Sequence, residues 1–532
     1  MNKIAKYLNQ QLIGNVFDSA PILEGYSTDR SALKITPRMV VVPENVSDVR
    51  RTVRFISQLA SKSVHIPITV RGSGLDKTGA DLGSGLVLST EHLNKILEID
   101  DHARLVRVQA GVTLGQLNSA LALYGLHVPI LADPRETIGA LISNFTTDSA
   151  AGKYNGIYYY VDCIEAVTST GDTIQTGRFS RHLLSQKTRL TSFEGSLYRE
   201  TDKLIDSNSD LISSLGARST IDAAGYQMIT QVVRENTRSF DLLPLFYAAQ
   251  GTLGIITEAI LHCEVYQPQV RHFVAAFESI GAALSYIESI AYLIPEELNL
   301  YDARIFKTAA EHGKDPALFA PKFNKGYMVW VAFNDKPRKT NKKLQKCLKL
   351  LPDNAAAVME TDDNTTDFQR LNSAIVSYLN DDVRGERVPF IDDFYVAPDH
   401  LSNFLTDLRT LEKAEKLELP IFGSFSTSNY NLRPDIQLNS VEGRQFIVKF
   451  MKEFNELLKE HGGSLTGGSP EGRIKATITN QELSDEEIEL YDKIKTIFDP
   501  NQIFNPDIKL GATPNATVRH IRTGYNNGVT TI

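Results

Sequence analysis

The stretch Val70-Arg71-Gly72-Ser73-Gly74-Leu75-Asp76 follows a β-like run, residues 64–70, and combines two glycines with one arginine and one acid. Glycine lets a backbone approach a ligand closely and adopt a positive φ without a Cβ clash. The backbone N–H groups of such a loop can form a nest for an anion, and Arg71 adds a fixed positive charge. Taken alone, the stretch is compatible with a diphosphate-binding loop and equally with a hairpin turn that carries a surface arginine.

Upstream of this loop, the sequence predicts a β-α-β unit. Residues 39–43 are a short apolar strand candidate, and Asn45 or Ser47 can cap the helix that follows. Residues 64–70 form the second strand, in which Pro67 limits hydrogen bonding to an edge or irregular position. The glycine-rich loop therefore lies at the end of a strand.

The sequence after the loop excludes a Rossmann site. A Rossmann glycine loop opens directly into a helix, whose N-terminus holds the pyrophosphate. Here residues 72–85 are rich in glycine and turn formers, and they lead into another strand candidate, Leu86–Ser89. A phosphate can still be bound by the amides of the loop, but in a different fold.

Two further stretches combine glycine with other small residues. Residues 137–144 (Thr-Ile-Gly-Ala-Leu-Ile-Ser-Asn) follow a rigid loop that contains Asp133-Pro134, and residues 247–254 precede a strand candidate, residues 255–262. Small residues let a backbone approach a flat ring system, but a closely packed helix start needs small residues too. Both interpretations remain open at this level.

The pattern changes around residues 265–268. From there to about residue 460, strand-like and helix-like runs alternate, which predicts a second α+β domain. The strand-like runs are residues 273–277, 326–333, 389–396 and 420–425, and the helix-like runs are residues 281–292, 339–351, 398–413 and 441–460. Residues 499–506 form a turn-rich return segment, and we expect the polar tail after Gly511 to be loosely held.

The composition excludes several classes of protein. The 532 residues carry a formal net charge of −8, which argues against a nucleic-acid-binding protein with a basic face. Cys163, Cys263 and Cys347 lie far apart and form no CxxC motif, so an iron–sulfur cluster, a zinc knuckle and a disulfide framework are not supported. The sequence shows neither a signal peptide nor a spanning helix, which predicts a cytoplasmic protein and leaves peripheral contact with a membrane open.

A series of short motifs follows along the chain in a fixed order. They are Arg71-Gly72-Ser73-Gly74, Gly111-Val112, Thr137-Ile138-Gly139, Lys153-Tyr154, Gly251-Thr252-Leu253-Gly254, Gly462-Gly463-Ser464, Glu471-Gly472-Arg473, Phe498-Asp499-Pro500 and Phe504-Asn505-Pro506. In order and separation they resemble the FAD-linked oxidases of the vanillyl-alcohol oxidase and p-cresol methylhydroxylase type. The resemblance covers about residues 38–510. It is greatest with D-lactate and D-2-hydroxyacid dehydrogenases, especially the larger relatives that carry an added iron–sulfur half.

The resemblance implies an α+β fold. A PCMH-type FAD-binding domain with two subdomains would be followed by an α+β substrate domain, or cap domain. The expected boundaries are an N-terminal arm at 1–37, the FAD-binding domain at 38–266, the substrate domain at 267–470, a C-terminal segment that returns to the flavin at 471–510, and a polar tail at 511–532.

FAD is the cofactor that the resemblance implies. The loop at residues 71–76 would hold its pyrophosphate, residues 137–144 would line the dinucleotide and the flavin edge, and residues 253–256 would lie near the adenosine half. Asn505 and Lys509 would reach toward the flavin ring and the substrate, where a positive charge stabilises reduced flavin. The implied cofactor-binding residues are Arg71, Gly72, Ser73, Gly74, Leu75, Asp76, Pro134, Thr137, Gly139, Ala140, Ser143, Asn144, Gly254, Ile255, Ile256 and Asn505.

Two features of the sequence depart from the family pattern near the cofactor. Leu75 occupies the position at which some relatives attach FAD covalently through a histidine, which predicts non-covalent FAD. The relatives usually have Gly-Ser-Glu before the Gly-Thr-Leu-Gly motif, whereas this chain has Ala248-Ala249-Gln250. We expect the fold to tolerate this second change.

A third departure concerns metal. Many hydroxyacid dehydrogenases of this family bind a divalent metal through two histidines and a Glu-His pair, and the metal clamps and acidifies the substrate hydroxyl. At those positions this chain has Ser424, Asn431 and the pair Gly468-Ser469. Because all four ligands are replaced, the sequence predicts that no metal is bound.

Without a metal, a hydroxy acid needs another base and another anchor for its carboxylate. Arg433 can pair a carboxylate in a bidentate manner, Tyr430 can act as acid or base, and Glu471 and Lys475 lie beside the vacated positions. These four are the catalytic candidates, with Asp393 as a further carboxylate. Each also has a structural explanation: a structural arginine, a core tyrosine, or a solvated charge.

These features together predict an FAD-dependent oxidoreductase that acts on CH–OH groups. A hydride would pass from a small hydroxy substrate to flavin N5 without a metal. The alternatives are a metal-free flavin oxidase of an alcohol or a sugar, and a flavin-binding protein without dehydrogenase activity. Since three scattered cysteines cannot build an iron–sulfur half, the electrons would leave to a quinone, a partner protein or oxygen. The oligomeric state is left open.

Overall fold

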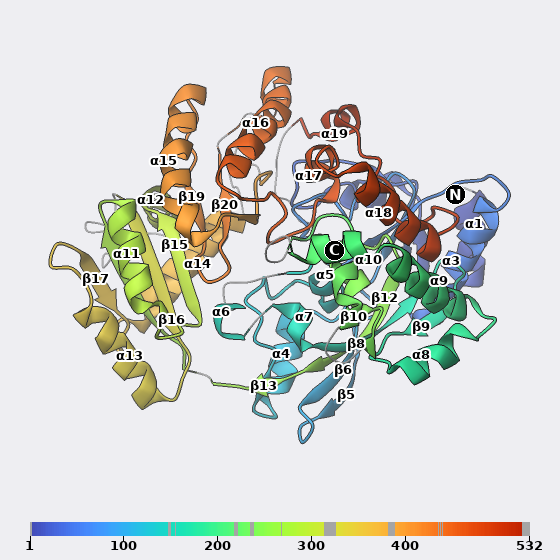
Figure 1. Cartoon of the computed structure of the whole chain (residues 1–532), viewed down its shortest axis with the longest axis horizontal. Coiled ribbons are helices and arrows are strands. Elements are labelled where there is room, and N and C mark those ends of the chain that lie inside the picture. The colour runs from blue at the N-terminus through green and yellow to red at the C-terminus, as the bar shows by residue number, and fades with distance from the viewer. Residues whose placement is uncertain are drawn as a thin grey trace.

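The computed structural model describes residues 3–146, 151–154, 156–217, 222–234, 239–267, 269–312, 326–380, 389–434, 436, 438 and 440–523. Two bodies lie side by side in Figure 1. Among the described residues, the first is built from the N-terminal half of the chain and carries a four-stranded sheet, a five-stranded sheet and two short two-stranded pairs, and the second contains a seven-stranded sheet. The C-terminal helices return to the first body, so both ends of the chain contribute to it.

The first sheet contains the β-α-β unit that the sequence predicts. Its strand order is β1-β2-β4-β3, with β2, β4 and β3 parallel and β1 antiparallel. The strands are β1 (Asn15–Phe17), β2 (Met39–Val42), β3 (Ile68–Arg71) and β4 (Leu86–Ser89). Helix α3 (Val46–Ala60) begins at Asn45, whose side chain accepts a hydrogen bond from the Asp48 amide at 3.1 Å, so Asn45 and not Ser47 is the cap.

The second sheet is antiparallel, in the order β5-β6-β12-β8-β9. Its strands are β5 (Ile96–Asp100), β6 (Leu105–Gln109), β8 (Val161–Val167), β9 (Thr173–Gln175) and β12 (Ile255–His262). Helices α4 (Leu114–Ala122) and α5 (Ile138–Ser143) pack on it, and their apolar faces form one core with β6, β8 and β12. The remaining elements of this body are α1 (Lys3–Gln11), α2 (Ala20–Gly25), β7 (Leu126–His127), α6 (Ala151–Tyr154), α7 (Ile157–Tyr160), α8 (Arg181–Thr188), α9 (Phe193–Ser207), α10 (Ser209–Ala217), β10 (Val233–Arg234), β11 (Ser239–Phe240) and β13 (Glu264–Val265).

The second body is a seven-stranded sheet covered on both faces by helices. Its strand order is β17-β14-β16-β15-β19-β20-β18. The strands are β14 (Arg271–Phe277), β15 (Glu297–Asp302), β16 (Tyr327–Phe333), β17 (Ala356–Met359), β18 (Phe394–Tyr395), β19 (Ile421–Ser424) and β20 (Asn429–Leu432). Alternate side chains of β14 and β16 enter two different cores, as the period of two in a strand requires.

Helices of the second body divide between these two cores. Helices α11 (Ile280–Ala291), α13 (Pro337–Lys349), α15 (Pro398–Glu415) and α16 (Val441–Glu460) cover one face. Helices α12 (Ala303–His312) and α14 (Thr365–Asn380) cover the other face. The helix runs predicted for this region are confirmed, and so are the strand runs at residues 273–277, 326–333 and 420–425. The strand predicted at residues 389–396 is wrong for most of its length, since only β18 (Phe394–Tyr395) forms there. β15, β17, β20, α12 and α14 are additional elements that the sequence did not predict.

The C-terminal part of the chain packs back onto the first body. Helices α17 (Gly472–Thr479) and α18 (Asp485–Phe498) are followed by the return segment, in which Phe504 forms a β-bridge with Ile68, the first residue of β3. The expectation of a loosely held tail is wrong for residues 514–522. Helix α19 (Pro514–His520) forms there, and Arg522 is only 5% exposed because it packs against the N-terminal arm. Residues 524–532 lie outside the described residues.

Candidate functional site

A cavity of about 830 Å³ lies between the glycine-rich loop and the sheet of the second body. Its first wall comes from the loop after β3, the start of α5 and the start of β12. Its second wall comes from β15, α14, β19 and β20, and from the residues that precede α17. The cavity therefore joins the two bodies at the places where the sequence motifs occur.

Fourteen of the sixteen implied cofactor-binding residues line this cavity. They are Gly72, Ser73, Gly74, Leu75, Asp76, Pro134, Thr137, Gly139, Ala140, Ser143, Asn144, Gly254, Ile255 and Ile256. Arg71 and Asn505 do not line it. The fold thus brings together three stretches that are far apart in the sequence, while their contacts with FAD stay predicted.

The glycine-rich loop has the properties of an anion nest. In the described part of the chain, the backbone N–H groups of residues 72–76 donate to no protein acceptor. Gly74 has a φ of +71°, and a Cβ there would lie 2.3 Å from the Arg71 guanidinium. A row of unpaired backbone amides beside a cavity is the donor set that a pyrophosphate requires. The loop therefore fits the phosphate part of FAD.

The side chain of Arg71 does not line the cavity and instead contacts residues next to the loop. Its Nη2 donates to the Thr28 carbonyl at 2.9 Å, and its Nη1 lies 3.7 Å from Asp81 Oδ1. The guanidinium also lies 5.4 Å from the centre of the Tyr26 ring. The guanidinium of Arg71 thus contacts residues of the protein and does not line the cavity, and its contact with the cofactor stays a prediction.

The start of α5 meets the loop directly. The Thr137 hydroxyl caps the helix by accepting from the Ala140 amide at 3.4 Å, and a Cβ on Gly72 would lie 2.4 Å from that hydroxyl. A Cβ on Gly139 would lie 2.9 Å from the Cβ of Ala110. Close packing therefore requires these small residues, and Gly139 and Ala140 also line the cavity. The close-packing interpretation of this helix start is therefore confirmed, and the approach of a flat ring stays a prediction.

Asn505 is a structural residue of the return segment. Its amide nitrogen donates to the carbonyls of Ala80 and Gln250, both at 2.8 Å. Its amide oxygen accepts from the Thr69 hydroxyl and from Arg473 Nη2, both at 3.0 Å. With these contacts its hydrogen-bonding capacity is used within the protein, so the expectation that Asn505 reaches the flavin is not supported.

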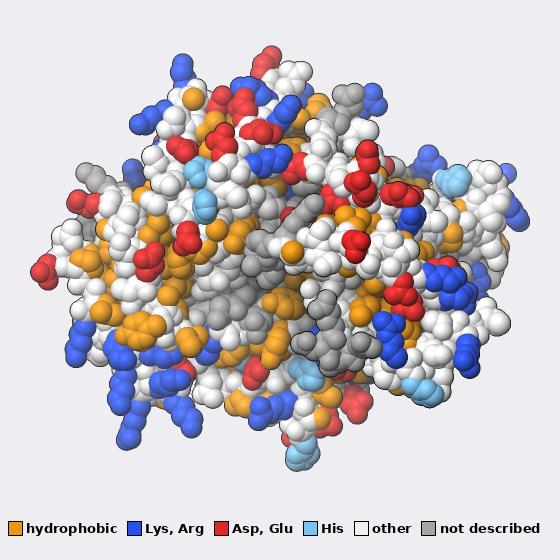
Figure 2. Space-filling model, viewed as in Figure 1, with side chains coloured by type: hydrophobic (Ala, Val, Ile, Leu, Met, Phe, Trp, Pro, Cys, Tyr) orange, Lys and Arg blue, Asp and Glu red, His pale blue; other side chains and the backbone are white. Residues whose placement is uncertain are grey.

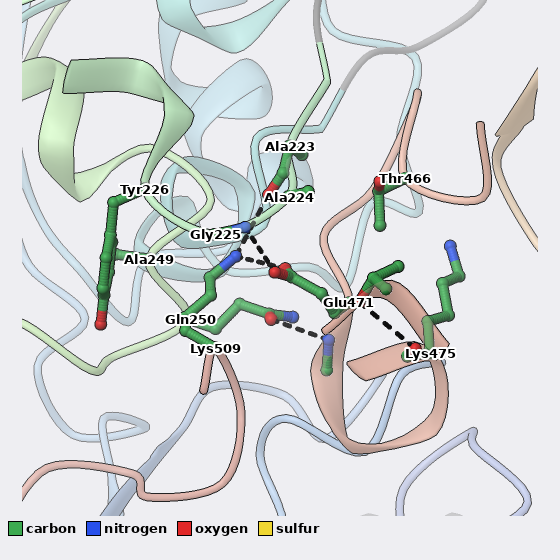
Figure 3. A network of polar contacts seen from close by, with 12 residues as sticks. Ala223, Ala224, Gly225, Tyr226, Ala249, Gln250, Thr466, Glu471, Lys475 and Lys509 are labelled. Carbon is green, nitrogen blue, oxygen red and sulfur yellow. Dashed lines mark hydrogen bonds and ion pairs between the residues drawn. The ribbon is translucent and has the colours of Figure 1, made fainter. Parts of the chain in front are cut away.

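Glu471 lies in a buried polar network beside the cavity, not in its wall (Figure 3). Its carboxylate accepts from the Gly225 amide and pairs with Lys509 Nζ at 2.5 Å. Burial raises the pKa of Glu471, and Lys509 opposes this shift. Gln250, which does line the cavity, accepts from the Gly472 amide at 3.0 Å and donates to Thr78 and Asn144. The network joins the cavity wall to the C-terminal segment.

The ammonium group of Lys475 likewise makes its hydrogen bonds within the protein. Its ammonium donates to the carbonyls of Asp392 and Leu465, at 2.6 and 2.8 Å, and to the Ser469 hydroxyl at 3.0 Å. In Figure 3 it points away from Glu471. Burial lowers the pKa of Lys475. Of these contacts only Ser469 lines the cavity, so Lys475 positions a wall residue and does not itself reach the cavity.

Arg433 and Tyr430 both lie behind the cavity wall. Arg433 forms a buried bidentate pair with Asp392, and its guanidinium lies 5.1 Å from the centre of the Phe422 ring. Tyr430 is fully buried in the core of the second body. On β20 the neighbouring residues Asn429 and Asn431 face the cavity. Because side chains alternate along a strand, Tyr430 points the other way. Both residues have structural contacts in this position, and their catalytic roles stay predictions.

The second wall of the cavity is mainly polar and uncharged. The four positions that hold metal ligands in relatives, occupied here by Ser424, Asn431, Gly468 and Ser469, all line the cavity. The hydroxyls of Ser424 and Thr427 are buried without a hydrogen-bond partner in the described part of the chain. Buried hydroxyls without partners are suited to binding a polar ligand. Asp393 is the charged side chain that the described residues of the second body place in this wall.

Two carboxyl groups in the first wall have pKa values near neutrality. Burial raises the pKa of Glu136 to about 7, and Lys77 opposes the shift. Burial, together with the charge of Asp29, raises the pKa of Asp76 to about 6. Asp76 accepts from Thr78 and from the Ala80 amide, whereas no hydrogen bond to the Glu136 carboxylate is found among the described residues.

Sequence reasoning missed Glu136. It lies directly before the capping residue Thr137, which marks it as an acid at the start of a cavity-lining helix. Its raised pKa, however, depends on burial by segments that are distant in the sequence, which no local pattern reveals. Asp29, Asp76 and Asp81 form a carboxylate cluster, none of whose members occupies one of the four positions that hold metal ligands in relatives.

Comparison with known families identifies both bodies. Residues 37–177 match the model of an FAD-binding domain, and residues 267–508 match the C-terminal domain of FAD-linked oxidases. The chain belongs to the FAD-linked oxidase family. FAD is therefore its cofactor, and the resemblance, the fold class and the cofactor predicted from the sequence are confirmed.

Curated relatives of this family member are hydroxy-acid enzymes of low identity. A D-2-hydroxyglutarate dehydrogenase from Pantoea ananatis (strain AJ13355) is 24% identical over 500 residues, covering 90% of this chain and 48% of that protein. Glycolate oxidase subunit GlcD from Bacillus subtilis (strain 168) is 25% identical, covering 88% of each chain. The chain spans about half the length of the D-2-hydroxyglutarate dehydrogenases it matches.

Solved structures support the fold. A p-cresol methylhydroxylase with substrate bound superposes with a TM-score of 0.68 at 13% identity, and the alignment covers 97% of each chain. At this identity the likeness concerns architecture alone. Within the described residues, no helix combines the length and apolar character needed to cross a membrane.

Proposed function

We propose that this protein is an FAD-dependent dehydrogenase or oxidase that oxidises a CH–OH group of a small molecule without a metal. The observation that carries the proposal is the continuous cavity. One wall contains the loop amides, which donate to no described protein acceptor, and the opposite wall is polar. The family membership supports the same reading, since its named relatives act on hydroxy acids.

The residues that would hold FAD come from three segments of the first body. The amides of residues 72–76 would hold the pyrophosphate, and residues 137–144 and 254–256 would line the rest of the dinucleotide. Leu75 at the loop gives no nucleophile for a covalent link, so the cofactor would be held without one. FAD, when bound, accepts a hydride at its N5 atom.

Removal of a hydride from a CH–OH group also requires that the hydroxyl proton is taken up. Glu136 is suited to this role because it lines the cavity and its pKa of about 7 allows it to be ionised at neutral pH. Its carboxylate has no hydrogen bond to a described residue, so it is available to a substrate. We therefore assign Glu136 the role of general base in this proposal, in place of Glu471 and Tyr430.

The absence of a metal from the proposed mechanism rests on the chemistry of the donor set. Ser424, Asn431, Gly468 and Ser469 offer hydroxyl, amide and backbone groups where relatives offer imidazole and carboxylate. Neutral oxygens of this kind bind transition metals weakly. Metal analysis of the purified protein checks this point, and stoichiometric zinc or manganese would contradict it.

A specific observation favours a neutral alcohol or sugar as the second candidate substrate class. In the described part of the second wall, the polar groups are amides and hydroxyls together with Asp393. The cations of the first wall already lie beside acids: Arg30 and Arg135 are 3.0 and 2.8 Å from Asp133, and Lys77 is 3.4 Å from Asp392. A carboxylate substrate would have to compete with these acids, whereas a hydroxyl-rich molecule needs only hydrogen bonds.

The test is anaerobic substrate screening of the flavin-loaded protein. A panel of 2-hydroxy acids, alcohols and sugars is added, and bleaching of the visible flavin band is followed. Bleaching by a hydroxy acid or by a neutral alcohol or sugar would support the proposal and identify the class. Bound flavin that no member of the panel bleaches would favour a flavin-binding protein without dehydrogenase activity.

Two additions complete this experiment. Oxygen, a quinone or a candidate partner protein is supplied after reduction, and the one that restores the flavin band is the electron acceptor. Acid precipitation then tests the mode of cofactor attachment. A colourless pellet is expected, whereas a yellow pellet would show a covalent link that the sequence at Leu75 argues against.

A further inference from the structure

Helix α13 gives the second body a strongly basic outer face. Between residues 336 and 349 the chain carries seven cations, and Asp335 is the acid beside them. Lys339 and Lys343 pair with Asp335 at 2.9 and 2.7 Å. The remaining cations are exposed and form no ion pair with a described residue; they are Lys336, Arg338, Lys342, Lys346 and Lys349. Such a concentration contrasts with the net charge of −8 of the whole chain.

The spacing of these cations disfavours the helix in isolation. Arg338, Lys342 and Lys346 follow one another at intervals of four residues, so like charges lie one turn apart on the same face. Like-charge pairs at this spacing repel each other and destabilise a helix. A binding partner of opposite charge would remove that repulsion.

Exposed apolar side chains adjoin the same face. Tyr292, Ile294, Leu348 and Leu350 are 61%, 58%, 45% and 41% exposed. The ammonium of Lys346 lies 5.7 Å from the centre of the Tyr292 ring, so the two groups of residues are contiguous. Figure 2 shows Lys and Arg side chains gathered at the corner of the molecule where Figure 1 has α13, with an apolar area next to them.

We propose that α13 and the loop after α11 form a docking surface for an anionic lipid bilayer. Lysine side chains are long enough to keep their ammonium groups among headgroups while neighbouring apolar side chains enter the interface. Each cation near an anionic membrane surface adds to the attraction. The prevalence of lysine over arginine and the adjacent apolar residues favour lipid over an acidic protein, which arginine would pair more specifically.

Docking through α13 does not depend on the proposed reaction. Helix α13 contributes no residue to the cavity, so docking and cofactor binding are separate properties. Docking would bring the protein to the surface that holds lipid-soluble electron acceptors. A quinone is one of the three acceptor classes considered above.

The test is co-sedimentation of the full chain with vesicles. Phosphatidylcholine vesicles with and without phosphatidylglycerol are compared, at low and at high salt. We expect binding to the anionic vesicles only, and weaker binding at high salt because the attraction is screened. Equal binding to both kinds of vesicle, or binding to neither, would overturn the proposal.

Matched variants locate the surface. The triple variant Lys342→Glu, Lys346→Glu, Lys349→Glu should lose binding by on the order of 100-fold or more, given the contribution of each cation. The control variant Lys62→Glu, Lys413→Glu, Lys452→Glu changes the net charge equally at exposed positions elsewhere and should retain most binding. An equal loss in both variants would show that net charge alone is responsible and would overturn the assignment to α13.

A second pair of substitutions separates lipid from protein as the partner. Tyr292→Ser with Leu348→Ser removes exposed apolar surface while leaving every lysine in place. If these side chains insert into the interface, the double variant should bind vesicles more weakly than the natural protein, and this difference should remain at high salt. Unchanged binding would mean purely electrostatic adhesion and would favour an acidic protein partner instead.

Discussion

Glu136 and Glu471 are both acids near the cofactor loop. Glu136 lines the cavity and its carboxylate forms no hydrogen bond or ion pair with a described residue, whereas Glu471 is not in the cavity wall. Glu471 is paired with Lys509 at 2.5 Å and hydrogen-bonded to the Gly225 amide, whereas Glu136 lies in the cavity wall. A carboxylate that the protein already pairs cannot easily accept a substrate proton. At the scale of single residues, the environment of each acid decides its role.

Glu136→Gln is expected to lower kcat by about 100-fold or more, the usual contribution of a general base. In the natural protein, activity should rise with pH through about 7 as Glu136 ionises, and the variant should lack this rise. The measurement is a pH–rate profile alongside the flavin spectrum, which should be unchanged. Glu98→Gln, at an exposed position on β5, is the matched control, and a similar loss there would contradict the assignment.

Stability provides a second check on Glu136 that does not need a substrate. Its folded pKa is raised above the unfolded value of 4.5, so its protonated form is favoured in the folded state. The stability that it contributes is therefore present at low pH and is lost as the pH rises toward 7. Glu136→Gln should accordingly be more stable than the natural protein at pH above about 7 and similar to it below pH about 4. Urea titrations at both pH values measure the difference.

Lys509→Met is expected to destabilise the protein by about 3 to 5 kcal/mol, because it leaves the buried charge of Glu471 without its partner. The double variant Glu471→Gln, Lys509→Met should regain a large part of that loss. Urea unfolding of the two variants checks this coupling. If the double variant is no more stable than Lys509→Met, the pair is not the structural unit described above.

At the scale of elements, the loop after β3 depends on Gly74. This residue has a φ of +71°, and its missing Cβ leaves room for the Arg71 guanidinium that supports the loop. The loop amides keep their orientation toward the cavity only while this backbone geometry is maintained. One position thus links a local conformation to the cofactor site.

Gly74→Ala should cost about 1 to 2 kcal/mol from the left-handed conformation alone, with more from displacement of Arg71. We expect weaker FAD retention, which gel filtration followed by flavin absorbance would measure. Gly281→Ala is the control, because a Cβ at that position in α11 meets nothing within 4 Å. Equal flavin loss in both variants would show that the loop geometry is not responsible.

At the scale of the whole molecule, the C-terminal tail is coupled to the cofactor loop. Arg522 donates from Nε to the Leu33 carbonyl at 2.8 Å, and its guanidinium lies 3.6 Å from Asp29. The neighbouring Arg30 amide donates to the Asp76 carbonyl in the loop at 3.0 Å. The last described residues thus hold the N-terminal arm against the FAD-binding loop.

Arg522→Ala is expected to lower Tm and to increase FAD loss, although Arg522 does not line the cavity. The physical reason is that it leaves Asp29 buried without its cation and loosens the arm. Thermal unfolding with and without added FAD measures both effects. Arg519→Ala, an exposed arginine on α19, should change neither, and an effect of equal size there would contradict the coupling.

The local sequence pattern contains enough information to place one residue whose role the sequence analysis left open, Tyr430. In Asn429-Tyr430-Asn431-Leu432, polar and apolar residues alternate, so Tyr430 shares a face with Leu432 and belongs to the core. The strand period alone would have excluded it from the cavity. For Arg433 no such local signal exists, since its partner Asp392 lies 41 residues earlier.

The sequence by itself determined the cofactor loop and its strand context, the FAD-linked oxidase family, and the replacement of the four metal ligands. These depend on residue type and short spacing, which are local properties. The tertiary structure decided which charged side chains reach the cavity. Glu471 and Lys509 are 38 residues apart, and Arg522 and Leu33 are 489 apart, yet each pair is in contact. Whether a charge is paired, buried or available depends on such long-range contacts, which only the folded chain brings together.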